Sequence, residues 1–292
     1  MKTMAGLGRY LERPTVQVLT IGLLLAALYH RVIVELGHDW IVDENYSHGF
    51  LIPLVSAYMI WRQRARIRSL RPDSSGIGLV LLLSGLLLFT VASIAAEYFT
   101  QRFSLLVVMG GLVLYLKGKR LAGTVAFPLV YLVFMIPVPY VVYYSVSFPL
   151  ELLASRATAS VVALLGIPIV RAGNILRLEG TTLQVVDACS GLRSLLSLSA
   201  LAAAMAYLTQ RTFLAGILLF LASVPVAIGA NVLRLTVTAI LASMYGERVA
   251  EGFLHQFSGV LVFAFAIICL GFIGGILRWL VSGKDTGWPS AC

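Results

Sequence analysis

The stretch LQVVDACSGLRS, residues 183–194, stands where a polar segment passes into a long apolar run. Cys189 lies within it, with Asp187 two residues before and Arg193 four residues after. A helix that starts directly after Cys189 would set its positive end beside the sulfur, where backbone N–H groups favour a thiolate over a thiol. The stretch therefore predicts a nucleophile, although a lone cysteine in an apolar chain is more often a small buried hydrophobe.

The composition places the chain among membrane proteins. Of its 292 residues, 59% are hydrophobic and only 12% are charged, whereas soluble domains are roughly 45–50% apolar. In a soluble domain the net charge of +9 would suggest a nucleic-acid surface, but in a membrane protein the positive-inside rule accounts for it. We therefore predict an all-α polytopic membrane protein with no nucleic-acid partner.

The apolar runs predict about eight transmembrane helices. They cover residues 15–34, 46–61, 76–96, 103–116, 122–137, 191–208, 213–229 and 257–281. The first run is long for the core of a signal peptide and lacks a small-residue cleavage site, so we expect it to be retained. Two details stay open. The seventh helix continues to Tyr245 in one interpretation, and residues 140–168 form either one interfacial or re-entrant helix or a pair of half-helices.

The distribution of charge predicts the orientation of the helices. With both termini in the cytoplasm, 14 of the 22 Lys and Arg residues fall on the cytoplasmic side, but only 3 of the 13 Asp and Glu residues do. The strongest cytoplasmic marker is a group of five arginines within residues 62–71. Because positively charged loops tend to stay inside, this asymmetry predicts cytoplasmic termini.

Residues 171–187 alternate apolar and polar side chains on both sides of Gly180, as a small strand pair does. We expect a short extracytoplasmic β-hairpin that leads into Cys189. The sequence shows neither an internal repeat nor a soluble second domain, so residues 1–292 are interpreted as a single integral membrane domain.

Three residues of acyl-transfer chemistry converge on one membrane face in this topology. Cys189 lies at the outer start of the sixth span, Arg234 at the outer end of the seventh and His255 at the outer start of the eighth. A thiol needs a base or an ion-pair partner, for which His255 is the candidate, and a tetrahedral intermediate needs a donor to its oxyanion, for which Arg234 is the candidate. Asn231 precedes Arg234 by three residues on the same helical face and could orient its guanidinium.

Each of these residues also has a purely structural explanation. Arg234 could cap a helix end and extend to the lipid headgroups, and His255 could be an interfacial polar residue. Arg193 could neutralise Asp187 or a lipid phosphate. Their combination on one face favours a functional site, because ionisable residues near membrane depth are costly.

The two remaining cysteines give no sign of a metal centre. Cys269 lies within the eighth span and Cys292 is the last residue, and neither has metal-ligand spacing around it. We therefore predict neither a metal nor another cofactor.

Longer motifs run through the chain. They are YSHGFLIPL at 46–54, FPLVYLVFMIPVP at 127–139, IPIVRAGNILRL at 167–178, VVDACSGLRSL at 185–195, ANVLR at 230–234, and His255 with Gly259. Together they resemble the exosortase family of bacterial multi-pass membrane proteins, and the resemblance covers nearly the whole chain.

The resemblance implies a cysteine-dependent transpeptidase or endopeptidase that works through a thioester acyl-enzyme. Its partners would be exported proteins whose C-terminal sorting signal consists of a Pro-Glu-Pro motif, a hydrophobic helix and a basic tail. It would lie in the inner membrane of a Gram-negative bacterium, with its active site at the periplasmic face. The family's catalytic cysteine, arginine and histidine fall on Cys189, Arg234 and His255. Where the family often has glutamate two residues before the cysteine, this chain has Asp187, a shorter carboxylate.

A non-catalytic role is the alternative. The chain would then be a transporter or scaffold component of exopolysaccharide export, in which Cys189 is structural and Arg193, Arg234 and His255 line a polar pathway. The two interpretations differ in the chemistry of the thiol, because only the enzyme requires Cys189 to react with an electrophilic peptide.

Overall fold

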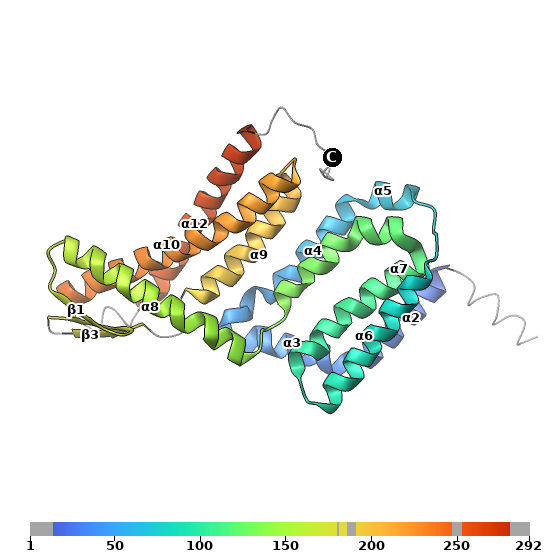
Figure 1. Cartoon of the computed structure of the whole chain (residues 1–292), viewed down its shortest axis with the longest axis horizontal. Helices are drawn as coiled ribbons and strands as arrows, with labels where there is room; N and C mark the ends of the chain where they lie inside the picture. Colours follow the sequence, from blue (N-terminus) through green and yellow to red (C-terminus); the bar gives the residue numbers. More distant parts are fainter. Residues whose placement is uncertain (1–13, 180, 186–190, 247–252, 281–292) are drawn as a thin grey trace, which may run out of the picture. The chain divides into compact units, whose positions relative to one another are not determined.

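The computed structural model describes residues 14–179, 181–185, 191–246 and 253–280, and their side chains from residue 20 to 246 and from 259 to 280. These residues form helices and one small sheet (Figure 1). The chain divides into two compact units. The first contains residues 1–50 and 67–137, and the second contains residues 51–66 and 138–292.

Five described helices are long and apolar enough to cross a membrane, and a sixth crossing is present if a bent helix pair counts as one span. The five are α6 (Gly76–Ile94), α7 (Tyr98–Tyr131) with η2 (Leu132–Met135), α9 (Leu192–Thr209), α10 (Phe213–Tyr245) and α12 (Phe253–Leu280). The predicted class of polytopic helical membrane protein is confirmed. The predicted count of about eight spans is not reached among the described residues.

The first two predicted spans are not straight crossings. The first is divided into α2 (Pro14–Leu28) and α3 (His30–Val42), which meet at a bend of 67°. The second consists of the 3-10 helix η1 (Glu44–Phe50) and α4 (Leu51–Arg62), which α5 (Arg64–Ser69) follows. Because α4 has 12 residues and a crossing needs about 20, α4 alone is too short to span a bilayer.

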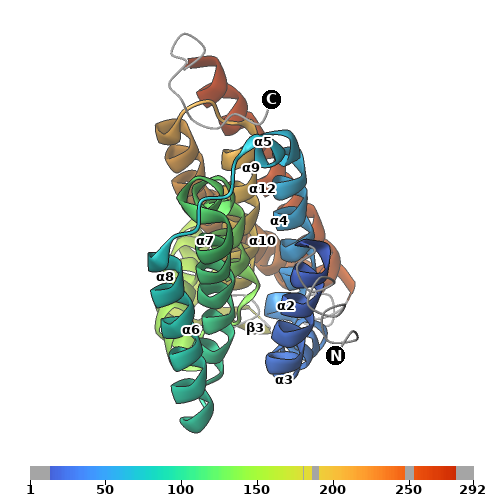
Figure 2. The ribbon, with the colours of Figure 1, turned by 90° about the vertical axis from the view of Figure 1, so that its right-hand side faces the viewer.

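The fourth and fifth predicted spans form the two halves of α7. Gly118 interrupts this helix with φ +84° and ψ 179°, a backbone conformation that favours glycine. A cavity of about 420 Å³ has lining residues from both halves, between Phe103 and Leu114 in one and between Ala122 and Val130 in the other. The halves therefore run alongside each other, and α7 packs against α6 (Figure 2). The two halves and η2 together, residues Tyr98–Met135, are the second of the five candidate spans given above.

α8 (Tyr140–Leu164) belongs to the second unit and decides the interpretation left open for residues 140–168. It is one continuous helix with Pro149 inside it, so two separate half-helices are not found there. It is 25 residues long, but it is not among the helices that are apolar enough to count as crossings. Glu151 lies in its middle and is buried.

The predicted hairpin is a three-stranded antiparallel sheet. β1 (Ile169–Ala172), β2 (Ile175–Leu178) and β3 (Thr181–Gln184) pair in chain order. The alternation of apolar and polar residues thus corresponds to three strands, whereas the predicted hairpin has two. Leu176 and Leu178 of β2 are buried in clusters with side chains of α8 and α10, so the sheet packs against both helices.

α9, α10 and α12 pack side by side as a three-helix bundle (Figure 1). Their shared core consists of Leu198, Ala202, Ala206, Leu219, Ala227, Ala230, Ala266 and Leu270. Alanine is abundant in it, and small side chains let membrane helices approach closely. At one end of the bundle the side-chain amide of Gln210 donates to the carbonyl oxygen of Gly274 over 3.1 Å.

Candidate active site

Three of the predicted site residues have described side chains, namely Arg193, Asn231 and Arg234. Cys189 and Asp187 lie outside the described residues. The backbone of His255 is in the first turn of α12, and its side chain is outside the described part of the chain. The structure therefore defines the frame around the predicted nucleophile: both ends of the segment 186–190, and the part of α10 that these ends contact.

α9 begins at Leu192, and Gly191 joins it to the segment 186–190. Gly191 precedes the helix with φ +84°, and its carbonyl oxygen accepts the first helical hydrogen bond, from the N–H of Leu195 over 2.8 Å. The positive end of the helix dipole thus lies at the end of the segment that carries Cys189. Arg193 is in the first turn of α9 and is half-buried.

Gly191 packs directly against Asn231 of α10. A Cβ atom added to Gly191 would lie 2.9 Å from the Cγ of Asn231, well inside the separation of about 3.5–4.0 Å that carbon atoms prefer. Asn231 is itself only 4% exposed. The positive φ and the close contact both require glycine at residue 191, and together they attach the start of α9 to the middle of α10.

Asn231 and Arg234 lie within α10. The prediction of a helix end near residue 229 is wrong, and the longer interpretation, in which the helix continues to Tyr245, is confirmed. The reason is local: residues 230–245 contain neither glycine nor proline, and Gly246 ends the helix with φ +82°. Because the helix is continuous, Asn231 and Arg234 share one face, three residues apart.

Arg234 is partly enclosed by the protein. Its side chain is half-buried and its Nε is buried. A partly buried arginine side chain loses less conformational entropy when it binds an anion than a fully exposed one does. Its positive charge is permanent. Arg234 is therefore suited to be a fixed donor toward a developing negative charge.

Val185, the residue before the segment 186–190, also lies beside α10. Val185 is 1% exposed and lies in one buried cluster with Ala154, Leu176 and Leu235. The residues on either side of the segment therefore lie against α10 near Leu235 and at Asn231, within about one helical turn of Arg234.

The first turn of α12 lies toward the same end of the bundle. Gly274, near the end of α12, faces Leu219, near the start of α10, so the two helices are antiparallel. The part of α10 that carries Arg234 consequently lies toward the start of α12, where the backbone of His255 is found. The fold thus brings the helix segments that carry Arg193, Arg234 and His255 to one end of the bundle.

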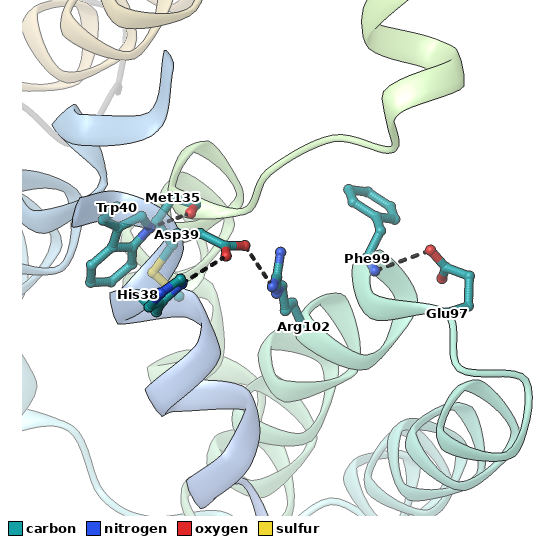
Figure 3. A network of polar contacts seen from close by, with 7 residues as sticks. All are labelled: His38, Asp39, Trp40, Glu97, Phe99, Arg102 and Met135. Atoms are coloured by element: carbon teal, nitrogen blue, oxygen red, sulfur yellow. Dashed lines mark hydrogen bonds and ion pairs between the residues drawn. The ribbon is translucent and has the colours of Figure 1, made fainter. Parts of the chain in front are cut away.

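A polar cluster in the first unit was not predicted as a site. Arg102 of α7 donates from Nη2 to Asp39 of α3 over 2.7 Å, and its side chain is 9% exposed (Figure 3). Trp40 donates from Nε1 to the carbonyl oxygen of Met135 over 2.9 Å. These contacts hold α3 against α7 and η2. The only sequence signal was the presence of ionisable residues beside apolar runs, which does not reveal their partners.

Glu97 caps the N-terminus of α7 within the same view (Figure 3). Its carboxylate accepts hydrogen bonds from the N–H of Phe99 over 3.0 Å and from that of Thr100 over 2.6 Å. Burial acts to raise the pKa of Glu97, but its hydrogen bonds outweigh burial and hold the pKa below its ordinary value.

No group of three His, Cys, Asp or Glu side chains is placed to hold a metal ion among the residues that the structure describes. Cys269 is a free thiol within α12 and is half-buried. For the whole chain, the expectation of no metal and no cofactor stays a prediction.

The spans and the sheet that packs against α8 and α10 define a polytopic helical membrane protein. A family model described as transmembrane exosortase matches residues 40–272. The match covers most of the chain, which therefore belongs to the transmembrane exosortase family, as the sequence motifs predicted. No curated protein and no solved structure matches the chain significantly.

Proposed function

We propose that this protein is a membrane-embedded cysteine transpeptidase or endopeptidase that cleaves the C-terminal sorting signals of exported proteins. Its membership of the transmembrane exosortase family supports this function. The observation that carries the proposal is the pair of contacts that flank the segment 186–190: Gly191 packs against Asn231 of α10, and Val185 lies in one buried cluster with Leu235 of α10.

Cys189 is the proposed nucleophile. As a thiolate it attacks the scissile carbonyl carbon, and Arg234 donates hydrogen bonds to the oxygen as it becomes negative. His255 transfers the thiol proton to the leaving amine while the C–N bond breaks. A thioester between Cys189 and the N-terminal part of the substrate remains. An amine resolves it in transpeptidation, or water in hydrolysis, and the thiol is regenerated.

Asn231 and Arg193 have proposed supporting roles, and Asp187 is the proposed partner of Arg193. Asn231, one turn before Arg234 on the same face, orients the guanidinium and fixes the start of α9 through Gly191. Arg193 is on the helix that follows the nucleophile, so it is better placed to hold Asp187 or to tune the thiol than to approach the substrate carbonyl from across the site.

We place this site at the periplasmic face of the inner membrane, with cytoplasmic termini. The distribution of charged residues supports this orientation. α10 has 33 residues and is therefore about 50 Å long, whereas the hydrocarbon core is about 30 Å thick. If Phe213 marks the cytoplasmic boundary, the opposite boundary falls about 20 residues later, close to Arg234.

This depth suits the substrate that the family resemblance implies. The hydrophobic helix of the sorting signal would pack among the spans, its basic tail would stay in the cytoplasm, and its Pro-Glu-Pro motif would reach the outer boundary, where Cys189 is proposed to act. The partners are thus exported proteins that carry this signal.

Capture of the acyl-enzyme tests the proposed function. The purified protein in lipid vesicles is mixed with a reporter protein that ends in a Pro-Glu-Pro motif, an apolar helix and a basic tail, and intact masses are recorded. We expect an adduct on Cys189 with the mass of the reporter's N-terminal fragment, which hydroxylamine releases. If the reporter stays intact, the enzyme proposal fails and the transporter or scaffold interpretation remains. If its tail is still lost with Cys189→Ala, the nucleophile is another group.

A further inference from the structure

A buried carboxylate lies beside the sheet, outside the residues assigned to catalysis. Glu151 of α8 is 4% exposed, and a carboxylate at such depth is costly unless hydrogen bonds satisfy it. Its Oε1 accepts from the hydroxyl of Ser147 over 3.1 Å, and its Oε2 accepts from the side-chain amide of Asn174 over 3.2 Å. An apolar side chain would fill the same space without this cost, so the carboxylate points to a specific role.

Asn174 connects Glu151 to the end of β3. It lies in the turn between β1 and β2, and its side-chain amide also donates to the carbonyl oxygen of Val185 over 3.0 Å. The N–H of Val185 in return donates to the carbonyl oxygen of Asn174 over 2.9 Å. The two protons of one amide group therefore bridge Glu151 and Val185. Glu151 orients the amide, and the amide holds Val185.

The same turn is attached to α8 at a second point. The hydroxyl of Ser155, which is fully buried, donates to the carbonyl oxygen of Gly173 over 3.0 Å. Ser155 follows Glu151 by four residues and so lies one helical turn further along the same face. The turn is therefore fixed to a rigid helix rather than to a loop.

We propose that Glu151 and Asn174 are positioning residues for the nucleophile, a role that rests on the proposed function. Acting through Val185, they set the point at which the chain leaves the sheet and enters the segment that carries Cys189. The contact between Gly191 and Asn231 holds the other end. The residues on either side of 186–190, Val185 and Gly191, are thus both held in place. If one of these contacts is released, more conformations become available to the segment, and a displacement of about 1 Å at a reacting atom can lower a rate about 100-fold.

The kinetic test separates positioning from substrate binding. Glu151→Ala and Asn174→Ala should lower kcat for the reporter protein about 10- to 100-fold and leave KM within about two-fold, because the proposal assigns both residues to holding Val185 and neither to binding substrate. Glu151→Gln should restore kcat to within about three-fold of the wild type, since its amide oxygen can accept from Asn174 while its NH2 group donates to the hydroxyl of Ser147. Arg156→Gln is the matched control. It removes an exposed charge from the same helix and should leave kcat unchanged.

Hydrogen exchange at Val185 supplies a readout that does not depend on catalysis. Asn174→Ala and Glu151→Ala should accelerate exchange of the Val185 N–H at least about ten-fold, with the peptides of α9 and α10 unchanged. The proposal is overturned if Glu151→Ala loses activity while Val185 exchanges as in the wild type. It is also overturned if Glu151→Gln is as inactive as Glu151→Ala, or if exchange rises throughout α9 and α10. Should the wild type itself not cleave the reporter, the proposed function fails, and the exchange data still decide whether this pair holds Val185.

Discussion

Gly191 and Asn231 are closer together than any side chain at residue 191 would allow, because a Cβ atom there would lie 2.9 Å from the Cγ of Asn231. This contact joins the first turn of α9 to the middle of α10, one turn before Arg234. It also sets where the chain that follows Cys189 enters its helix. The relationship is steric, so substitutions that add or remove a few atoms can test it.

Gly191→Ala should destabilise the protein by about 1–3 kcal/mol. A residue with a Cβ atom is disfavoured at positive φ by about 1–2 kcal/mol, and the added methyl group overpacks against Asn231. Asn231→Ala removes the second penalty but not the first. In a double-mutant cycle of unfolding free energies in detergent, the double variant should therefore be more stable than the sum of the single effects predicts. If the two changes in unfolding free energy add exactly, the methyl group introduced at residue 191 does not contact Asn231.

Arg234→Lys should lower the processing rate about 10²–10³-fold, which corresponds to about 2.7–4 kcal/mol for a single oxyanion donor. A lysine carries the charge but lacks the planar fork of the guanidinium. Arg193→Lys should be milder, because neutralising Asp187 needs charge more than geometry. Processing rate and Cys189 alkylation rate are measured together, with membrane levels checked by immunoblot. Wild-type processing in Arg234→Lys together with an inactive Arg193→Lys would assign the oxyanion to Arg193.

The orientation can be tested by labelling single cysteines from outside intact spheroplasts, in a background without the native cysteines. Glu44→Cys and Glu179→Cys should react with a membrane-impermeant maleimide, whereas Arg66→Cys and Lys119→Cys should not. All four positions are exposed, so silence reports the side of the membrane. Lys119 is preferable to Gly118, where a side chain would overlap the carbonyl oxygen of Asp73. Labelling of Arg66→Cys from outside would invert the topology and remove the argument for a shared face.

Glu97→Ala should destabilise the protein by about 1 kcal/mol, because it leaves two N–H groups at the start of α7 without their acceptor. The pKa of Glu97 is lower in the folded protein than its ordinary value. Its carboxylate therefore stabilises the fold at pH values above the unfolded pKa, and this contribution is lost as the pH falls through the folded pKa. The difference in unfolding midpoint between wild type and Glu97→Gln should shrink over the same range. A constant difference would show that the charge at Glu97 does not stabilise α7.

Local signals were enough to predict α9, α10 and α12 of the second unit. The apolar run 191–208 corresponds to α9, and the continuation of the seventh helix to Tyr245 was one of the two interpretations of its sequence. The bend between α2 and α3 and the apposition of the two halves of α7 were not predicted, because an apolar run shows that a segment is buried or lipid-facing but not where it changes direction.

The candidate site could be predicted only as a set of residue types at helix ends. Arg234 and Asn231 were singled out from the sequence, and both lie within the continuous helix α10, three residues apart. The contact of Gly191 with Asn231 could not be predicted, nor could the link from Glu151 through Asn174 to Val185. Both join residues far apart in the chain, and side-chain hydrogen bonds leave no periodic pattern in a sequence.

The central claim is that Cys189 performs the chemistry, and mass spectrometry of a co-expressed sorting-signal protein tests it most directly. With the wild-type chain, with Cys269→Ala or with Cys292→Ala, the substrate should lose its apolar helix and basic tail and gain one defined new C-terminus. With Cys189→Ala or Cys189→Ser it should stay full length, because a hydroxyl cannot replace a thiolate without a stronger base. Recovery of the same new C-terminus with Cys189→Ala would contradict the account.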